Sequence, residues 1–437
     1  MGSVHDVVPA RGGRIAARLG QGLTRELWLV QIGVFLNALG WGAVLPFEVI
    51  YLHDGRGLSL GTAGLVVGTL TGVAVIAAPL TGPLIDRFGA RAAAAGAGIA
   101  LAAGYAGLAL AHSAAVAFAA AAVGGAGNGG LLPAQSALIA ALAARDVRHR
   151  ATAVSRVCTN VGFGAGGAAG GLVAGYGLPG LVALLLLNAV TYLGYVGVLI
   201  LVVRKPPRTE PLGGGYRRVL RDGAFVHLAA TNAVIIAVGW GVLPWVIPPY
   251  ARGGLGIGAP LIGLLLFANA ATVVVAQVPI AKAAEGRRRV VMMAAGAGAI
   301  ATACLFVLAA PALGKLSYLS LVVASIVIGA GECFHTAALM PLVADLAPVH
   351  LRGRYMATMG LSWWTGLALA PTAGTQLLSA SATLTFAICA AAAGAAAVSM
   401  LALDGRLPEA ARLTPRSCPA VRPPASPVGA APGASNG

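Results

Sequence analysis

The sequence predicts an all-α membrane protein with twelve transmembrane helices in two pseudo-symmetric six-helix bundles. Three observations lead to this fold class. Of the 437 residues, 58% are hydrophobic and 10% are charged, whereas about 25% are charged in an ordinary soluble domain. The apolar residues gather in runs long enough to cross a bilayer. The two halves of the chain also repeat the same residues at matching positions, and a water-soluble globule is excluded.

Twelve apolar runs reach the length of a transmembrane helix, which needs about 20 mainly apolar residues. Charges, Pro/Gly clusters and polar turns separate the runs. The predicted helices cover 27–50, 61–82, 92–111, 115–141, 153–175, 179–203, 224–250, 259–281, 290–310, 317–341, 355–378 and 383–403.

These runs divide the chain into five regions. The N-terminal segment, 1–26, is basic and Gly-rich, and the run behind it is too long for a cleavable signal peptide. An N-terminal bundle over 27–203 is joined to a C-terminal bundle over 224–403 by a polar, basic linker over 204–223. The tail over 404–437 is rich in Pro, Ala and Ser and has no apolar run, so we expect it to be disordered.

Lys and Arg residues predict the orientation of the chain in the membrane. Of the 29 Lys and Arg residues, 26 fall in the two terminal segments, in every second loop or, for Arg156, in the first turn of the helix after such a loop, and the remaining loops hold only Arg56, Arg252 and Lys315. Cytoplasmic loops carry the excess of positive charge in membrane proteins. We therefore expect a multi-pass protein of the cell membrane with both termini in the cytoplasm.

The two bundles share an internal repeat. The triplet Gly-Trp-Gly at 40–42, followed by Pro46, recurs at 239–241, followed by Pro244. Several residues between 57 and 91 recur 197 positions later. A six-helix unit repeated in the same orientation is typical of transporters that work by alternating access.

Residues 82–91, between the second and third predicted helices, read GPLIDRFGAR. The run resembles the G-x-x-x-D-[RK]-x-G-x-[RK] signature of the major facilitator superfamily. The matching residues are Gly82, Asp86, Arg87, Gly89 and Arg91. Glycine permits a tight turn and close helix packing here. The resemblance implies that this segment braces the two halves in an outward-open state, with Asp86 close to Arg354 at the start of the eleventh helix.

A glycine-rich run lies in the fifth predicted helix. It is similar to the antiporter motif G-x-x-x-G-P-x-x-G-G of the same superfamily, with Gly167 in the place of the proline. The matching residues are Gly162, Gly166, Gly170 and Gly171. Small residues at helical spacing let two helices approach closely, so general helix packing is the alternative interpretation.

Glu332 is the main candidate for a coupling residue. It falls in the middle of the tenth predicted helix, where a carboxylate costs about 2.5 to 3.5 kcal/mol on insertion scales. His335 lies one helical turn away and is expected to share a proton with Glu332. The surrounding segment resembles that of twelve-helix drug efflux members of the superfamily. The alternatives are a neutral packing role for either residue.

Other polar and aromatic residues in mid-helix are candidates for a substrate cavity. Amides hydrogen-bond ligands, and indole rings offer flat apolar faces. The candidates are Asn37, Trp41, Asn128, Trp240, Asn269 and Trp363, and for each a plain helix–helix contact is the alternative. Glu48, near the outer end of the first helix, is interpreted either as an external gate or as an interfacial residue.

The predicted function is proton-coupled efflux of small apolar or cationic compounds by a drug:proton antiporter. The alternatives are an importer or exporter of one metabolite, and a transport-inactive receptor or scaffold. We expect a monomer that binds protons and a small-molecule substrate in the lipid bilayer, with no nucleic-acid partner. No phosphate-binding loop, cofactor motif or metal-ligand spacing occurs, so no cofactor, metal or enzymatic activity is predicted.

Overall fold

The computed structural model describes residues 23–144, 147–201, 203, 217–348 and 351–414. Nearly all of them are helical. The elements are α2 (Arg25–Val44), η1 (Leu45–Phe47), α3 (Glu48–Ile50), η2 (Tyr51–Gly55), α4 (Leu60–Phe88), α5 (Ala90–Ala109), α6 (Ala114–Leu142), α7 (Arg148–Ala174), α8 (Leu178–Leu201), α9 (Gly223–Ile236), η3 (Ala237–Gly241), α10 (Val242–Trp245), α11 (Ile247–Leu255), α12 (Ala259–Ala284), α13 (Arg289–Ala309), η4 (Ala310–Leu316), α14 (Ser317–Leu346), α15 (Arg352–Ala380), α16 (Ala382–Ala402), η6 (Asp404–Arg406) and α17 (Glu409–Arg412).

The all-α fold class is confirmed. Ten stretches of the described chain are long and apolar enough to cross a membrane, and one of them, Arg289–Leu346, contains both α13 and α14. The less apolar α15 has 29 residues and packs along α4. With α9 counted together with the short helices that continue it, the described chain has twelve helices of membrane-spanning length.

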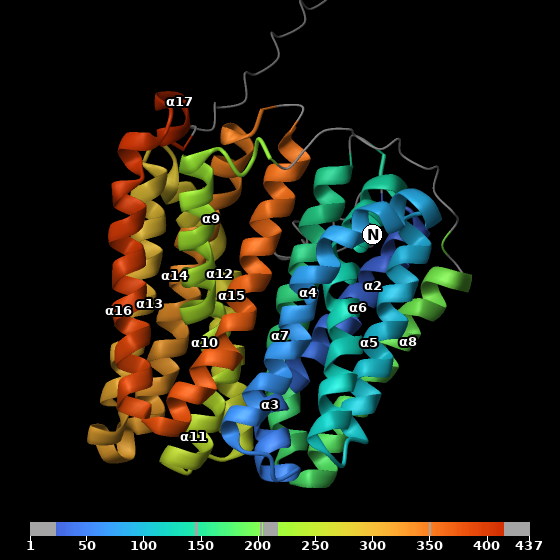
Figure 1. Ribbon diagram of the computed structural model, residues 1–437, viewed down its shortest axis with the longest axis vertical. Helices are drawn as coiled ribbons and strands as arrows, with labels where there is room; N and C mark the ends of the chain where they lie inside the picture. Colours follow the sequence, from blue (N-terminus) through green and yellow to red (C-terminus); the bar gives the residue numbers. More distant parts are fainter. Residues whose placement is uncertain (1–22, 145–146, 202, 204–216, 349–350, 415–437) are drawn as a thin grey trace, which may run out of the picture.

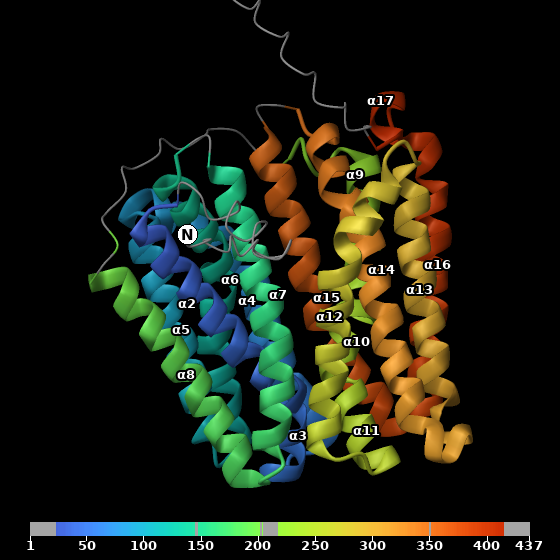
Figure 2. The same cartoon turned by 180° about the vertical axis from the view of Figure 1, so that it is seen from behind.

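The helices form two bundles. α2 and α4–α8 pack on one another in the first, and α9 and α12–α16 in the second. The main contacts between the bundles join α4 to α15 and α7 to α12. Figures 1 and 2 show the bundles converging at the end that holds α3 and α11, here called the α3/α11 end, and diverging toward the end that holds α17, the α17 end.

The first helix of each bundle is distorted around its repeated proline. α2 continues through the 3-10 turn η1, which contains Pro46, and the π-helical turn η2. α9 continues through the π-helical turn η3 into α10, which contains Pro244. Proline removes a helix hydrogen bond and its ring clashes with the preceding turn. The repeated proline therefore lies in a distorted stretch of helix in both bundles, but the π-helical turn follows it in the first bundle and precedes it in the second.

Glycines let the bundles touch at the backbone near the α3/α11 end. A Cβ atom added to Gly64 of α4 would stand 2.4 Å from the Pro371 carbonyl oxygen of α15. One added to Gly263 of α12 would stand 2.2 Å from the Gly167 carbonyl oxygen of α7. Both distances are far below van der Waals contact, so these crossings need glycine.

Replacing Gly263 by Val is expected to destabilise the protein by about 1 to 3 kcal/mol, because the side chain overpacks the α7–α12 crossing. Thermal unfolding of the purified protein in detergent measures the effect. Gly194→Val is the matched control, since Gly194 is exposed and a Cβ there meets no atom within 4 Å. Equal melting temperatures for the two variants would contradict the importance of this contact.

Helices run beyond several of the predicted apolar runs. α4 ends at Phe88 rather than near 82, and α7 begins at Arg148 rather than near 153. Helical hydrogen bonds continue into polar sequence, whereas an apolar run marks only the part of a helix that suits hydrocarbon. The predicted linker over 204–223 and the segment over 1–26 lie mostly outside the described residues.

The beginning of the C-terminal tail is folded, although the tail was expected to be disordered from Asp404 onward. Asp404 forms an ion pair of 2.5 Å with Arg288. The Thr414 N–H donates to the Arg287 carbonyl at 3.0 Å, and the Gly286 N–H donates to the Thr414 carbonyl at 2.9 Å. Backbone pairing and an ion pair compensate for the missing apolar run. The rest of the tail, 415–437, lies outside the described residues.

Candidate functional site

A cavity of about 280 Å³ lies between the two bundles. Residues from both bundles line it, and most of them are aromatic or aliphatic. The lining residues are Trp41, Leu45, Thr159, Asn160, Phe163, Trp240, Leu243, Pro244, Trp245, Leu266, Asn269, Ala270, Val273, Glu332, Trp363 and Leu367. Four of the six predicted cavity residues belong to this set. Asn37 and Asn128 do not, and both are buried away from it.

The cavity wall is built from interlocking aromatic rings. Trp41 and Phe163 meet edge to face with ring centroids 5.5 Å apart. Trp240 and Trp363 do the same at 5.4 Å. Edge-to-face contacts of this kind hold aromatic rings in defined orientations, so the faces presented to the cavity are set before a ligand arrives.

Among the described residues that line this cavity, Glu332 is the only ionisable one. It lies in α14 and is 7% exposed. The Asn269 side-chain N–H donates to its Oε1 atom at 3.2 Å. No Lys, Arg or His in the described part of the chain forms an ion pair with it. A carboxylate held by one neutral donor in a mostly apolar wall is poorly compensated when it is charged.

His335 belongs to a separate polar chain behind the wall. Its Nε2 atom lies 2.8 Å from the Asn232 side-chain oxygen. Because an amide oxygen only accepts, the imidazole donates in this contact. Asn232 donates onward to Ser362 at 2.7 Å, and Ser362 donates to the Ala229 carbonyl at 2.6 Å. The His335 ring also meets the edge of Trp240 at 5.9 Å.

Glu332 and His335 therefore do not share a hydrogen bond in this structure. Each has its own amide partner, on α12 for Glu332 and on α9 for His335. A spacing of three residues places two side chains on one face of a helix, but the neighbouring helices decide which groups each side chain reaches.

Glu48 is a second buried carboxylate, 3% exposed, in α3 at the α3/α11 end. The Tyr105 hydroxyl donates to its Oε1 atom at 3.0 Å, and the Trp245 ring N–H donates to its Oε2 atom at 2.9 Å. Tyr105 lies in the same bundle as Glu48, whereas Trp245 comes from the other bundle. Glu48 therefore bridges the two bundles and is not a surface residue.

The facilitator-type motif occupies the last turns of α4 and the first turn of α5. Asp86 and Arg87 are exposed near the α17 end, on helical turns and not in a loop. Gly89 ends α4 with φ +86°, a backbone conformation that favours glycine. The Arg91 side chain donates to the Val203 carbonyl at 2.7 Å and so connects α5 to a residue that follows the end of α8. The contact of Asp86 with Arg354 that the resemblance implies for an outward-open state stays a prediction.

The antiporter-like run serves two helix crossings at once. A Cβ atom added to Gly162, Gly166 or Gly170 would collide with backbone oxygens of α2. One added to Gly171 would meet α12 at the Ala259 carbonyl, 2.8 Å away. Close packing is therefore what this run does in the present conformation, and it places α7 between the two bundles.

Some residues of the site were not singled out from the sequence. Asn232 could have been found by the criterion that selected Asn269, an amide in the middle of an apolar run. Trp245 carries a weaker signal, since it stands 197 positions after Glu48, at the offset of the repeat. Nothing in the sequence indicates that Tyr105 contacts Glu48.

Two six-helix bundles around a central cavity are the architecture of many membrane transporters. The chain belongs to the Major Facilitator Superfamily, whose sequence profile matches residues 30–237 and 229–430. It is thus a multi-span membrane transporter of this superfamily, as the motif at 82–91 predicted.

Individual known proteins resemble the chain in sequence or in fold. It is 28% identical over 265 residues to the uncharacterized MFS-type transporter YttB of Bacillus subtilis (strain 168). The matched region covers 58% of this chain and 64% of that protein, so the chain spans less than two thirds of this relative. A peptide transporter POT matches with TM-score 0.75 and 16% identity over 91% of this chain and 99% of the other.

Two further solved structures share the fold. The nucleoside transporter NupG gives TM-score 0.70 and 14% identity over 87% of this chain and all of the other, 100%. A bacterial homologue of the human lysosomal transporter Spinster, in an inward-facing and unoccupied conformation, gives TM-score 0.65 and 17% identity over 86% and 93% of the two chains. At these identities the likeness concerns the fold alone.

Proposed function

We propose that this protein is a proton-coupled exporter of small apolar or cationic compounds, working as a monomer in the cell membrane by alternating access. The observation that carries the proposal is the position of Glu332. It is the one ionisable group among the described residues of the cavity wall, and its only described hydrogen-bond donor is the neutral Asn269.

Glu332 can serve both the proton and the substrate. When deprotonated, it offers a negative charge to a cation in the cavity, and when protonated it is neutral and has nothing to pair with. A proton and a cation therefore compete for the same group, so the transporter carries either one or the other. Competition of this kind produces antiport without a second coupling residue.

The aromatic wall favours flat apolar or cationic substrates. Trp41, Trp240, Trp245 and Trp363 line the cavity together with Phe163. A cation over an indole face gains about 0.5 to 2 kcal/mol, depending on how far it is desolvated. Contact between apolar surfaces adds to the binding free energy without requiring one particular ligand shape. Such a wall therefore suits a broad range of substrates.

The α17 end is the cytoplasmic end in this proposal. Basic residues at that end, among them Arg87, Arg91, Arg148 and Arg354, support this orientation by the positive-inside rule. Arg56, Arg252 and Lys315 lie toward the opposite end. Both termini are then cytoplasmic, and the conformation described here is closed toward the outside.

A specific metabolite transporter is the competing function, because solved neighbours in this fold transport peptides and nucleosides by their names. The cavity argues against substrates that carry a carboxylate or phosphate, since none of its described lining residues is Lys, Arg or His. A neutral metabolite is not disfavoured in this way.

Transport into inside-out vesicles with an acidic lumen tests the proposal. We expect ethidium, an aromatic cation, and several chemically unrelated dyes to accumulate in the lumen. Exchange of one proton for one monovalent cation moves no net charge, so a difference of 1 pH unit supports roughly tenfold accumulation. Accumulation of a single metabolite and of no dye would favour the competing function.

A further inference from the structure

The α3/α11 end is closed by two side-chain ties that join opposite bundles. The inner tie is the hydrogen bond of 2.9 Å from the Trp245 ring N–H to Glu48. The outer tie is the ion pair of 3.0 Å between Arg252 and Asp54. In both, the partners stand almost one repeat apart in sequence, 197 and 198 positions.

That spacing places both ties close to the pseudo-twofold axis. Residues at equivalent positions of two repeats meet one another only where they lie near the axis that relates the repeats. Identical residues would face each other there in a perfect repeat. In this chain the pairs have diverged into a donor with an acceptor and a cation with an anion, so each pair holds the two halves together.

The two ties differ in strength. The side chains of Arg252 and Asp54 are 44% and 42% exposed, and exposed ion pairs contribute little. Trp245 and Glu48 are 1% and 3% exposed, so water does not compete for their hydrogen bond. A bond to a carboxylate is about twice as strong as one between neutral groups. The inner tie is therefore the stronger of the two.

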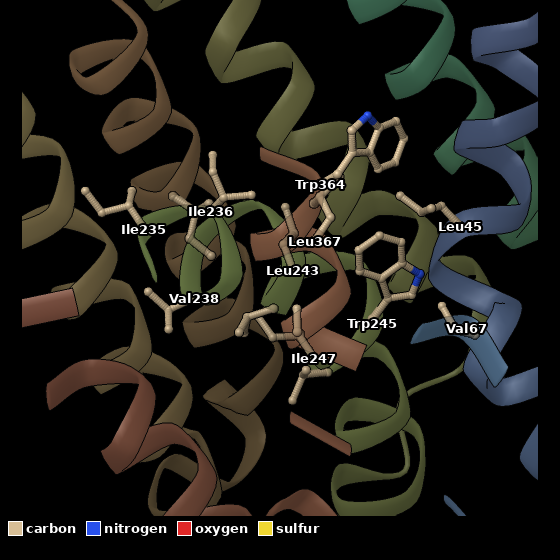
Figure 3. Packing of buried hydrophobic residues seen from close by; sticks show 14 of the residues in the cluster. Leu45, Val67, Ile235, Ile236, Val238, Leu243, Trp245, Ile247, Trp364 and Leu367 are labelled. Atoms are coloured by element: carbon tan, nitrogen blue, oxygen red, sulfur yellow. The ribbon is translucent and has the colours of Figure 1, made fainter. Parts of the chain in front are cut away.

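Trp245 also lines the central cavity. Figure 3 shows its ring nitrogen on the side that faces the helices of the first bundle, between Leu45 and Val67. The same indole thus touches the cavity with its carbon atoms and closes the α3/α11 end with its N–H. The Glu48 oxygen that it binds is not needed to hold Glu48 in its own bundle, because Tyr105 binds the other oxygen.

We propose that the hydrogen bond between Glu48 and Trp245 is the gate that closes the transport pathway at the α3/α11 end. This bond must break before the cavity opens at that end. The gate is distinct from the exchange of protons at Glu332. It rests on the transporter class of the protein and not on the identity of the substrate or the coupling ion.

The gate is tested by the reactivity of a cysteine in the cavity. Thr159, which lines the cavity, is replaced by Cys in a chain whose five native cysteines are replaced by Ser. A membrane-impermeant maleimide is added to oriented vesicles at the face that the α3/α11 end meets. The reagent reaches Cys only through transient opening, so its rate follows the open population.

Trp245→Phe is expected to raise this rate roughly tenfold, because the variant loses a charge-assisted hydrogen bond across the gate. Glu48→Gln should raise it less, since an amide oxygen still accepts from Trp245. Tyr105→Phe is the matched control: it removes a bond to the same carboxylate within one bundle, and its rate should stay within about twofold of the parent.

Labelling from the opposite face shows whether each variant is folded, because Thr159 is already exposed in the conformation described here. The gate is refuted if Trp245→Phe labels normally from that face and yet matches the parent from the α3/α11 face. Equal acceleration by Tyr105→Phe and Trp245→Phe would refute it as well. If Trp245→Phe does not label from the α17 face, that variant is not folded. The labelling rate of Glu48→Gln from the α3/α11 face is then compared with that of the parent instead. None of these rates depends on proton coupling.

Discussion

Replacing Glu332 by Gln is expected to abolish proton-driven accumulation. With 2 pH units across inside-out vesicles, the parent should concentrate ethidium about a hundredfold if one proton exchanges for one cation. The variant has no group on the described cavity wall that binds a proton or pairs with a cation. Its accumulation should therefore fall to the ratio found in vesicles without the protein.

The control for this variant is Glu409→Gln, which removes an exposed carboxylate of α17. It should accumulate ethidium as the parent does. Binding of an uncharged dye to purified Glu332→Gln, measured by fluorescence, should persist because the aromatic wall is unchanged. Accumulation by Glu332→Gln at the parental ratio would remove Glu332 from the coupling mechanism.

Replacing Trp240 by Ala is expected to weaken ethidium binding roughly ten- to a hundredfold, the usual cost of losing a buried aromatic residue at a binding site. The loss has two causes. The ligand loses an indole face, and Trp363 loses the edge-to-face contact that orients it. Equilibrium binding to the purified protein measures the change in Kd.

Trp240→Phe separates these causes, because a smaller ring keeps part of the wall while weakening the cation contact. Its Kd should fall between those of the parent and Trp240→Ala. Trp28→Ala is the negative control, since Trp28 is 41% exposed at the beginning of α2. An unchanged Kd for Trp240→Ala would mean that the ligand lies elsewhere.

Residue composition and the repeat were sufficient to predict the architecture. Apolar runs of membrane length report directly on the solvent around each helix, and the superfamily profile and the all-helical fold confirm that interpretation. The first and last residues of individual helices were harder to predict from the sequence. α4 and α7 continue through polar residues that hydropathy does not count as part of a span.

The site was predicted residue by residue, but not its connections. Glu332, Asn269 and three of the tryptophans were recognised as unusual in mid-helix, and they do line one cavity. Asn37 and Asn128 met the same criterion and are buried elsewhere. A polar residue in an apolar run signals a cost that something must offset, without indicating whether a ligand or a neighbouring helix does so.

Amino-acid order alone thus specified an all-helical membrane fold, its internal repeat and the residues that are costly to bury, because each of these depends on composition and spacing along the chain. The partners of those costly residues came from packing. His335 bonds Asn232, 103 positions away, and Glu48 bonds Trp245, 197 positions away. Such contacts arise only when helices distant in the chain are brought side by side, and no local pattern encodes that placement.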